Sequence, residues 1–68
     1  MVNIGDFVET RSRMRLGVPQ GTRGIVVNKT DGYYCMVYSP KSGEFFEAPI
    51  QNLSVLLKDK HMPKGKNG

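Results

Sequence analysis

Residues 18–27 read VPQGTRGIVV, and this stretch decides the fold of the chain. Proline fixes the backbone angle φ at about −65°, and glycine accepts the positive φ that other residues resist. Pro19 and Gly21 therefore predict a sharp reversal of the chain. The β-branched residues 25–27 that follow favour a pleated strand. A tight turn that leads directly into a strand predicts the corner of a small β-barrel.

The chain has 68 residues and a mass of 7.6 kDa, which is enough for one domain. A chain this short buries only about 60% of the surface that its unfolded form exposes, so we expect a stability of ~3–5 kcal/mol. Cys35 is the one cysteine and lies in an apolar run, so we expect a small buried side chain that forms no internal disulfide. A lone thiol is typical of a reducing compartment.

The first residues, MVNIGD, contain neither the basic region nor the apolar region of a signal peptide. The longest apolar runs are far shorter than the ~20 residues that a membrane span needs. We therefore expect a cytoplasmic protein that has no membrane partner.

The formal net charge is +4, and the sequence pI is about 9.5. Residues 58–68 hold four lysines and one aspartate, or +3, whereas residues 1–57 carry +1. The positive excess thus lies mostly in a segment with little apolar surface to offset the entropy cost of ordering it. We expect one folded domain over residues 1–57 and a flexible Lys/Gly-rich tail over residues 58–68.

Short apolar segments alternate with turns rich in glycine and proline, and no helical periodicity of useful length occurs. Asp31-Gly32 is a strong hairpin signal, and Pro49 is suited to open a single helical turn. The sequence therefore predicts an all-β fold, a small five-stranded barrel with a short helical turn before the last strand. Closure of the barrel is the economical arrangement because it removes exposed sheet edges. The expected strands span residues 5–10, 23–29, 33–38, 44–48 and 53–57.

The third expected strand, residues 33–38, is apolar on both faces. Such a run indicates a strand that is covered on each side, or one whose outer face meets a partner. A homodimer in which this strand pairs with a copy of itself is one alternative. The pattern alone leaves open which face of the strand points inward, because a change of register by one residue exchanges the two faces.

Four short motifs occupy turn and core positions of this pattern. They are Gly5-Asp6-x-Val8, Pro19-x-Gly21-Thr22-x-Gly24-x-Val26-Val27, Asp31-Gly32 ahead of Met36-Val37-Tyr38, and Leu53-x-Val55-Leu56. Over residues 4–57 the chain resembles an SH3-like small β-barrel. The resemblance is to the KOW modules of transcription and ribosomal proteins, and to SH3-like accessory subunits of photosynthetic and redox complexes. It implies a binding module for nucleic acid or for a larger protein complex, and it specifies fold better than function.

Catalytic and cofactor signals are weak in this sequence. His61 is the one histidine and lies in the expected tail, which disfavours a general base. No paired cysteines provide the spacing of a metal site. Gly21 and Gly24 lack the following Lys-Ser/Thr of a phosphate-binding loop. We therefore expect a protein that is not an enzyme and that needs no cofactor or metal.

The connection between the first two expected strands carries arginine at every second position, Arg11, Arg13 and Arg15. In an extended segment these three guanidinium groups share one face. One interpretation is an exposed segment that its charges keep soluble and unpaired. The other is a contact patch for the phosphate backbone of RNA or DNA. Arg23, which follows at the corner, would extend such a patch.

Tyr33 and Lys41 complete the set of candidate contact residues, one aromatic and one basic. Aromatic rings in this position either fill the core or offer faces on which bases stack. We therefore expect a module that binds nucleic acid mainly through backbone phosphates. The alternative is an adaptor or accessory subunit that docks on a larger protein complex through the same loops.

Overall fold

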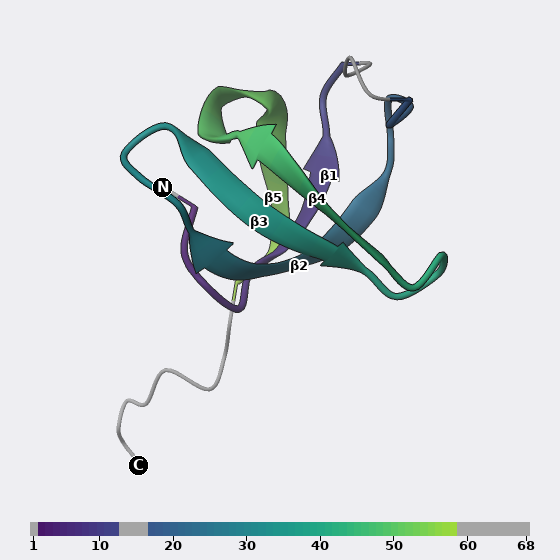
Figure 1. The fold of residues 1–68 in the computed structure, drawn as a ribbon, viewed down its shortest axis with the longest axis horizontal. Coiled ribbons are helices and arrows are strands. Elements are labelled where there is room, and N and C mark those ends of the chain that lie inside the picture. The colour runs from purple at the N-terminus through teal and green to yellow at the C-terminus, as the bar shows by residue number, and fades with distance from the viewer. Residues whose placement is uncertain (1, 13–16, 59–68) are drawn as a thin grey trace, which may run out of the picture.

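The computed structural model describes residues 2–12 and 17–58 of the chain. The fold is all-β, with five antiparallel strands in one sheet of order β4-β3-β2-β1-β5 and a 3-10 helix before the last strand (Figure 1). The all-β class and the helical turn before the last strand agree with the prediction from the sequence, which is confirmed on these two points. The elements are β1 (Phe7–Thr10), β2 (Arg23–Lys29), β3 (Tyr34–Ser39), β4 (Glu44–Pro49), η1 (Ile50–Asn52) and β5 (Leu53–Leu57).

The sheet curls but does not close. β4 and β5 are its two edge strands, so the predicted closure is absent from the strand pairings of residues 2–12 and 17–58. Figure 1 shows β3 and β4 crossing in front of β1 and β5, with β2 along the lower side of the fold. β3 lies between β2 and β4, and both of its edges are occupied. A homodimer formed by edge pairing of this strand is therefore incompatible with the fold.

The core lies inside the curl and is made of small and β-branched side chains. Its buried apolar members are Val2, Val8, Val26, Cys35, Val37, Ala48 and Leu53, with Phe46, Ile50 and Val55 packed against them. Cys35 is buried as predicted, and this burial raises the pKa of its thiol, while nearby Lys29 lowers it by a smaller amount. A thiol with a raised pKa holds little thiolate at neutral pH, so Cys35 is a packing residue.

β2 is paired on both of its edges, and Gly24 makes this double pairing fit. Gly24 lies opposite Val8 of β1, while the adjacent Ile25 lies opposite both Phe7 of β1 and Tyr38 of β3. A Cβ on Gly24 would overlap the carbonyl oxygen of Tyr38 and would come within 2.6 Å of a Val37 methyl carbon. β2 and β3 can approach this closely at residue 24 only because it has no side chain.

Replacement of Gly24 by alanine should therefore destabilise the fold. Overpacking of this kind costs about 1–3 kcal/mol, and the rigid backbone atom in the way favours the upper part of that range. Urea denaturation followed by circular dichroism measures the change. Gly32→Ala is the matched control, because a Cβ there meets none of the described atoms within 4 Å. Equal midpoints for the two variants would contradict this role of Gly24.

Candidate binding surface

The corner predicted at residues 19–22 is tied to the end of β1 by a buried threonine. The Thr10 side chain donates a hydrogen bond to the Pro19 carbonyl at 2.9 Å and accepts one from the Thr22 amide at 3.0 Å. The Thr10 amide donates to the Thr22 carbonyl, and the Gly21 amide donates to the Thr10 carbonyl, each at 2.9 Å. Gly21 has a φ of 85°, so glycine at this reversal is required as predicted.

The other end of the β1–β2 connection is fastened to η1 by Asn52. Asn52 Oδ1 accepts hydrogen bonds from the Ser12 amide at 3.0 Å and from the Ser12 hydroxyl at 2.7 Å, and Asn52 Nδ2 donates to the Ser12 carbonyl at 3.1 Å. The Arg11 amide donates to the Asn52 carbonyl at 2.8 Å. Both ends of the arginine-bearing connection are therefore fixed to the rest of the fold.

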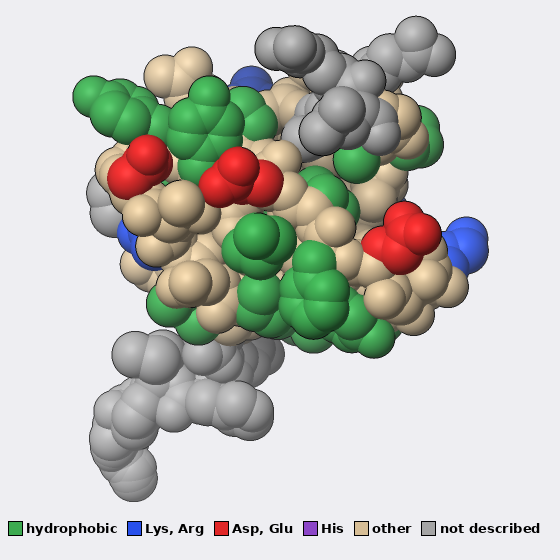
Figure 2. Space-filling view, in the orientation of Figure 1, with side chains coloured by type: hydrophobic (Ala, Val, Ile, Leu, Met, Phe, Trp, Pro, Cys, Tyr) green, Lys and Arg blue, Asp and Glu red, His purple; other side chains and the backbone are tan. Residues whose placement is uncertain are grey.

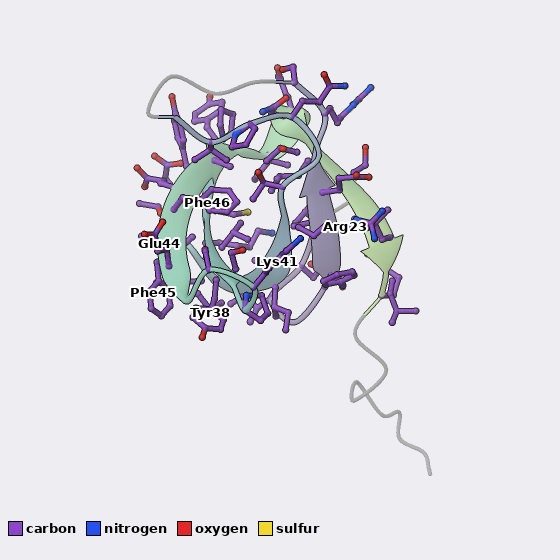
Figure 3. All side chains as sticks on the ribbon, turned by 90° about the vertical axis from the view of Figure 1, so that its right-hand side faces the viewer. Arg23, Tyr38, Lys41, Glu44, Phe45 and Phe46 are labelled. Carbon is purple, nitrogen blue, oxygen red and sulfur yellow. The ribbon has the colours of Figure 1, made fainter. Side chains whose placement is uncertain are left out.

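A broad, open groove lies along this side of the molecule. Its walls come from the β1–β2 connection, the β3–β4 turn, β4 and η1. The residues that line it include Glu9, Ser12, Gly17, Arg23, Lys41, Glu44, Phe46 and Glu47. Figure 3 faces this side and shows Phe46 pointing into the interior of the curl, Phe45 pointing away from it, and Lys41 and Arg23 on either side of the opening.

The charges along the groove nearly cancel. Arg23 and Lys41 are its cations, and Glu9, Glu44 and Glu47 are its carboxylates. Arg23 Nε lies 3.6 Å from Glu9 Oε2, but both side chains are partly exposed, so this ion pair adds little stability. Over residues 2–12 and 17–58 the chain has five basic and five acidic side chains. The entire formal excess of +4 therefore falls in residues 13–16 and 59–68.

Two of the six predicted contact residues come together, since Arg23 and Lys41 line the same groove. Arg11 is exposed beside η1, where its guanidinium donates a long hydrogen bond of 3.4 Å to the Gln51 carbonyl. Tyr33 is 73% exposed in the turn between β2 and β3 and does not line the groove. The predicted contacts Arg13 and Arg15 lie outside the described residues.

A buried carboxylate near the opposite end of β1 holds the chain where β5 ends. The Asp6 side chain is 2% exposed, and its Oδ2 accepts hydrogen bonds from the Asn3 amide at 2.8 Å and from Lys58 Nζ at 3.1 Å. This pairing joins positions 52 residues apart, and no local pattern in the sequence predicts it. The chain that continues from Lys58 therefore starts from a fixed point.

One row of large apolar side chains crosses the outer face of the sheet. Phe45 lies opposite Tyr38, Tyr38 opposite Ile25, Ile25 opposite Phe7, and Phe7 opposite Leu57, so the row runs through all five strands. The rings of Phe45 and Tyr38 are 4.8 Å apart at their centroids. Phe45 is 62% exposed and Leu57 54% exposed. Hydrophobic side chains also gather below β2 on the face shown in Figure 2.

This chain was compared with known families and structures. No family model and no curated protein matches the sequence. The fold is similar to part of a solved structure, the ββα-Me type II restriction endonuclease Hpy99I, with a TM-score of 0.68 and 16% sequence identity. The match covers 81% of this chain and 28% of that chain, and at this identity it concerns the fold alone.

The likeness corrects one prediction from the sequence. We expected a protein that is not an enzyme, but a fold of this shape forms part of an endonuclease. Exclusion of catalysis on the basis of sparse sequence signals was therefore wrong. Within residues 2–12 and 17–58, no three His, Cys, Asp or Glu side chains are arranged to hold a metal ion, and no helix is long and apolar enough to cross a membrane.

Replacement of Thr10 by valine should loosen the corner. The change removes a hydroxyl that makes two hydrogen bonds and leaves the Thr22 amide and the Pro19 carbonyl with one partner fewer, at a cost of about 1–3 kcal/mol. Thermal unfolding measures this loss. The matched control is Thr30→Val at an exposed position, which should change stability by less than about 0.5 kcal/mol. A Thr10→Val protein as stable as this control would contradict the role assigned to the hydroxyl.

Proposed function

We propose that this chain is a nucleic-acid-binding module with an SH3-like fold. The fold is similar to part of an endonuclease, a protein that acts on nucleic acid. Three features support the SH3-like assignment: the strand order, the pairing of β2 with both β1 and β3, and the 3-10 helix before the last strand. The module extends over residues 1–57, and the lysines of residues 58–68 add loose phosphate contacts.

The main support for nucleic-acid binding is the position of Arg13 and Arg15 in the sequence. Arg13 and Arg15 belong to a four-residue segment between Ser12 and Gly17, and both of these flanking residues line the groove. The guanidinium group of arginine matches the geometry of phosphate and stays charged at every physiological pH. Hydrogen bonds from Ser12 to Asn52 hold one end of this segment beside the groove. Phosphate oxygens in the groove would therefore meet the cations of a short segment whose two flanking residues line the groove.

The expected mode of binding is led by the backbone of the nucleic acid. Arg23 and Lys41 add single cations along the groove, Arg11 adds one beside η1, and Tyr33 offers an exposed ring for stacking. Point charges of this kind position a nucleic acid but carry little sequence information. The module should therefore bind RNA and DNA of different sequence with similar affinity.

Combined replacement of Arg13 and Arg15 by glutamine should weaken binding of a generic oligonucleotide. Each lost phosphate contact makes the slope of log K against log salt less negative by about 0.9. The slope for the double variant should therefore be smaller in magnitude by about two. Fluorescence anisotropy at several salt concentrations gives both affinity and slope. Lys29→Gln removes one charge outside the groove lining and is the control, because its slope should stay close to that of the parent chain. Equal slopes for the two variants would contradict the proposal.

Removal of residues 59–68 should leave the melting temperature of the module nearly unchanged. Lys58 stays in place, so its ion pair with Asp6 remains. The deleted segment holds three lysines and one aspartate, so nucleic-acid affinity should fall at low salt. Differential scanning calorimetry and the same anisotropy titration measure the two effects. A large drop in melting temperature would place the domain boundary beyond residue 58.

A second candidate function is docking on a larger protein complex. The observation that favours it is the apolar row from Phe45 to Leu57, because exposed apolar area of this kind marks protein interfaces. An interface with an apolar core depends much less on salt than phosphate binding does. Absence of binding to both RNA and DNA near micromolar concentration at low salt would favour this second function.

A further inference from the structure

Two exposed aromatic rings lie on the outer face of the sheet, and both line the groove. Phe45 of β4 is 62% exposed, and Tyr34 of β3 is 43% exposed. Alternate residues of a strand share a face, so Tyr34 is on the same face as Tyr38, which lies opposite Phe45. The two exposed rings are therefore separated by about 13 Å along the sheet, the length of four strand residues.

The ring of Phe45 is supported on one side by Tyr38. The two ring centroids are 4.8 Å apart, and the ring planes are tilted by 49°. Tyr38 is half-buried in β3, a strand that is paired on both of its edges. Phe45 thus contacts a fixed ring and turns the rest of its surface to solvent, pointing away from the interior of the curl (Figure 3). A supported ring of this kind loses little conformational freedom when a flat ligand covers it.

The charges near these rings are of both signs. Lys41 is exposed in the turn that leads into β4, whereas the exposed carboxylates Glu44 and Glu47 come before and after Phe45 within β4. A DNA duplex presents one phosphate charge per ~1.7 Å of its axis, so its backbone requires cations along the whole contact. Among the described residues the groove offers no such cationic strip, since Arg23 and Lys41 are matched by carboxylates. Contacts with bases suit this face better than contacts with a duplex backbone.

Flat aromatic rings distinguish a single strand from a duplex. In a duplex, successive bases lie about 3.4 Å apart along each strand and cover one another's faces. The bases of a single strand can turn outward and stack on aromatic side chains. Every base has such a face, so stacking tolerates any sequence, and it strengthens binding by about five- to 140-fold per base.

We propose that this module selects single-stranded nucleic acid, and that one base of the strand stacks on Phe45 and another on Tyr34. Lys41, in the turn before β4, pairs with a phosphate of the same strand. A duplex is held only through its phosphates and binds more weakly. This inference rests on the proposed function, nucleic-acid binding, and names the class of nucleic acid that the groove takes.

Fluorescence anisotropy of the full chain tests this selection with two probes, a labelled single strand and the duplex that this strand forms with its complement. The single strand should bind at least about tenfold more tightly at the same salt concentration. Phe45→Leu removes the flat ring but keeps an apolar side chain, so single-strand affinity should fall at least about fivefold while duplex affinity stays the same. Phe45→Tyr is the matched control, because it keeps the ring and should bind as the parent chain does. Both variants should keep the fold, since Phe45 is exposed.

Tyrosine emission provides a second measurement on the same samples. The chain has three tyrosines and no tryptophan, so tyrosine emission is observed directly. The single strand should quench this emission, and Tyr34→Leu should reduce the quenched fraction.

The outcomes separate this inference from the proposed function. Equal affinities for the single strand and the duplex would overturn the selection and leave nucleic-acid binding in place. A Phe45→Leu variant that binds the single strand as tightly as the parent chain would do the same. Absence of binding to both probes would refute the proposed function and this inference together.

Discussion

The absence of a side chain at Gly24 is the constraint on which this architecture depends. β2 must pair with β1 on one side and β3 on the other while the sheet curls enough to enclose a core. At the crossing, the backbone of Gly24 lies against Val37 and the Tyr38 carbonyl, where any side chain would collide. Val26, two residues further along, can then be fully buried between the layers.

The described residues carry no net charge, and the positive excess belongs to two other segments of the chain. The described residues carry equal numbers of acidic and basic side chains, and the one deeply buried carboxylate, Asp6, is paired with Lys58. The cations in excess belong to the connection after Ser12 and to the segment after Lys58. Ser12 and Lys58 lie toward opposite ends of β1. Thr10 of β1 pairs with Leu53, and Phe7 pairs with Leu57. The stability of the sheet should thus respond little to ionic strength.

The features that the sequence predicts correctly have local causes. Pro19 and Gly21 form the corner because their backbone preferences act within a few residues. The Ser12–Asn52 and Asp6–Lys58 contacts join positions 40 and 52 residues apart, and no spacing rule relates them. The inward face of β3 could not be predicted because residues 33–38 are apolar on both faces; the structure buries Cys35 and Val37. Closure was predicted because it removes exposed edges, but the β4 edge stays open and carries the exposed charges of Glu44 and Glu47 instead.

The open sheet has a kinetic consequence. β4 is bonded only to β3, and β5 only to β1, within the described strands, so neither edge strand supports the other. Each can detach while β2 and its two neighbours stay paired, which makes the edges separate units of local opening. The Ile50 amide, bonded to the Tyr33 carbonyl, and Asn52, bonded to Ser12, lie between these units on η1. Because η1 also forms part of the groove wall, opening of either edge strand would reach the groove through η1.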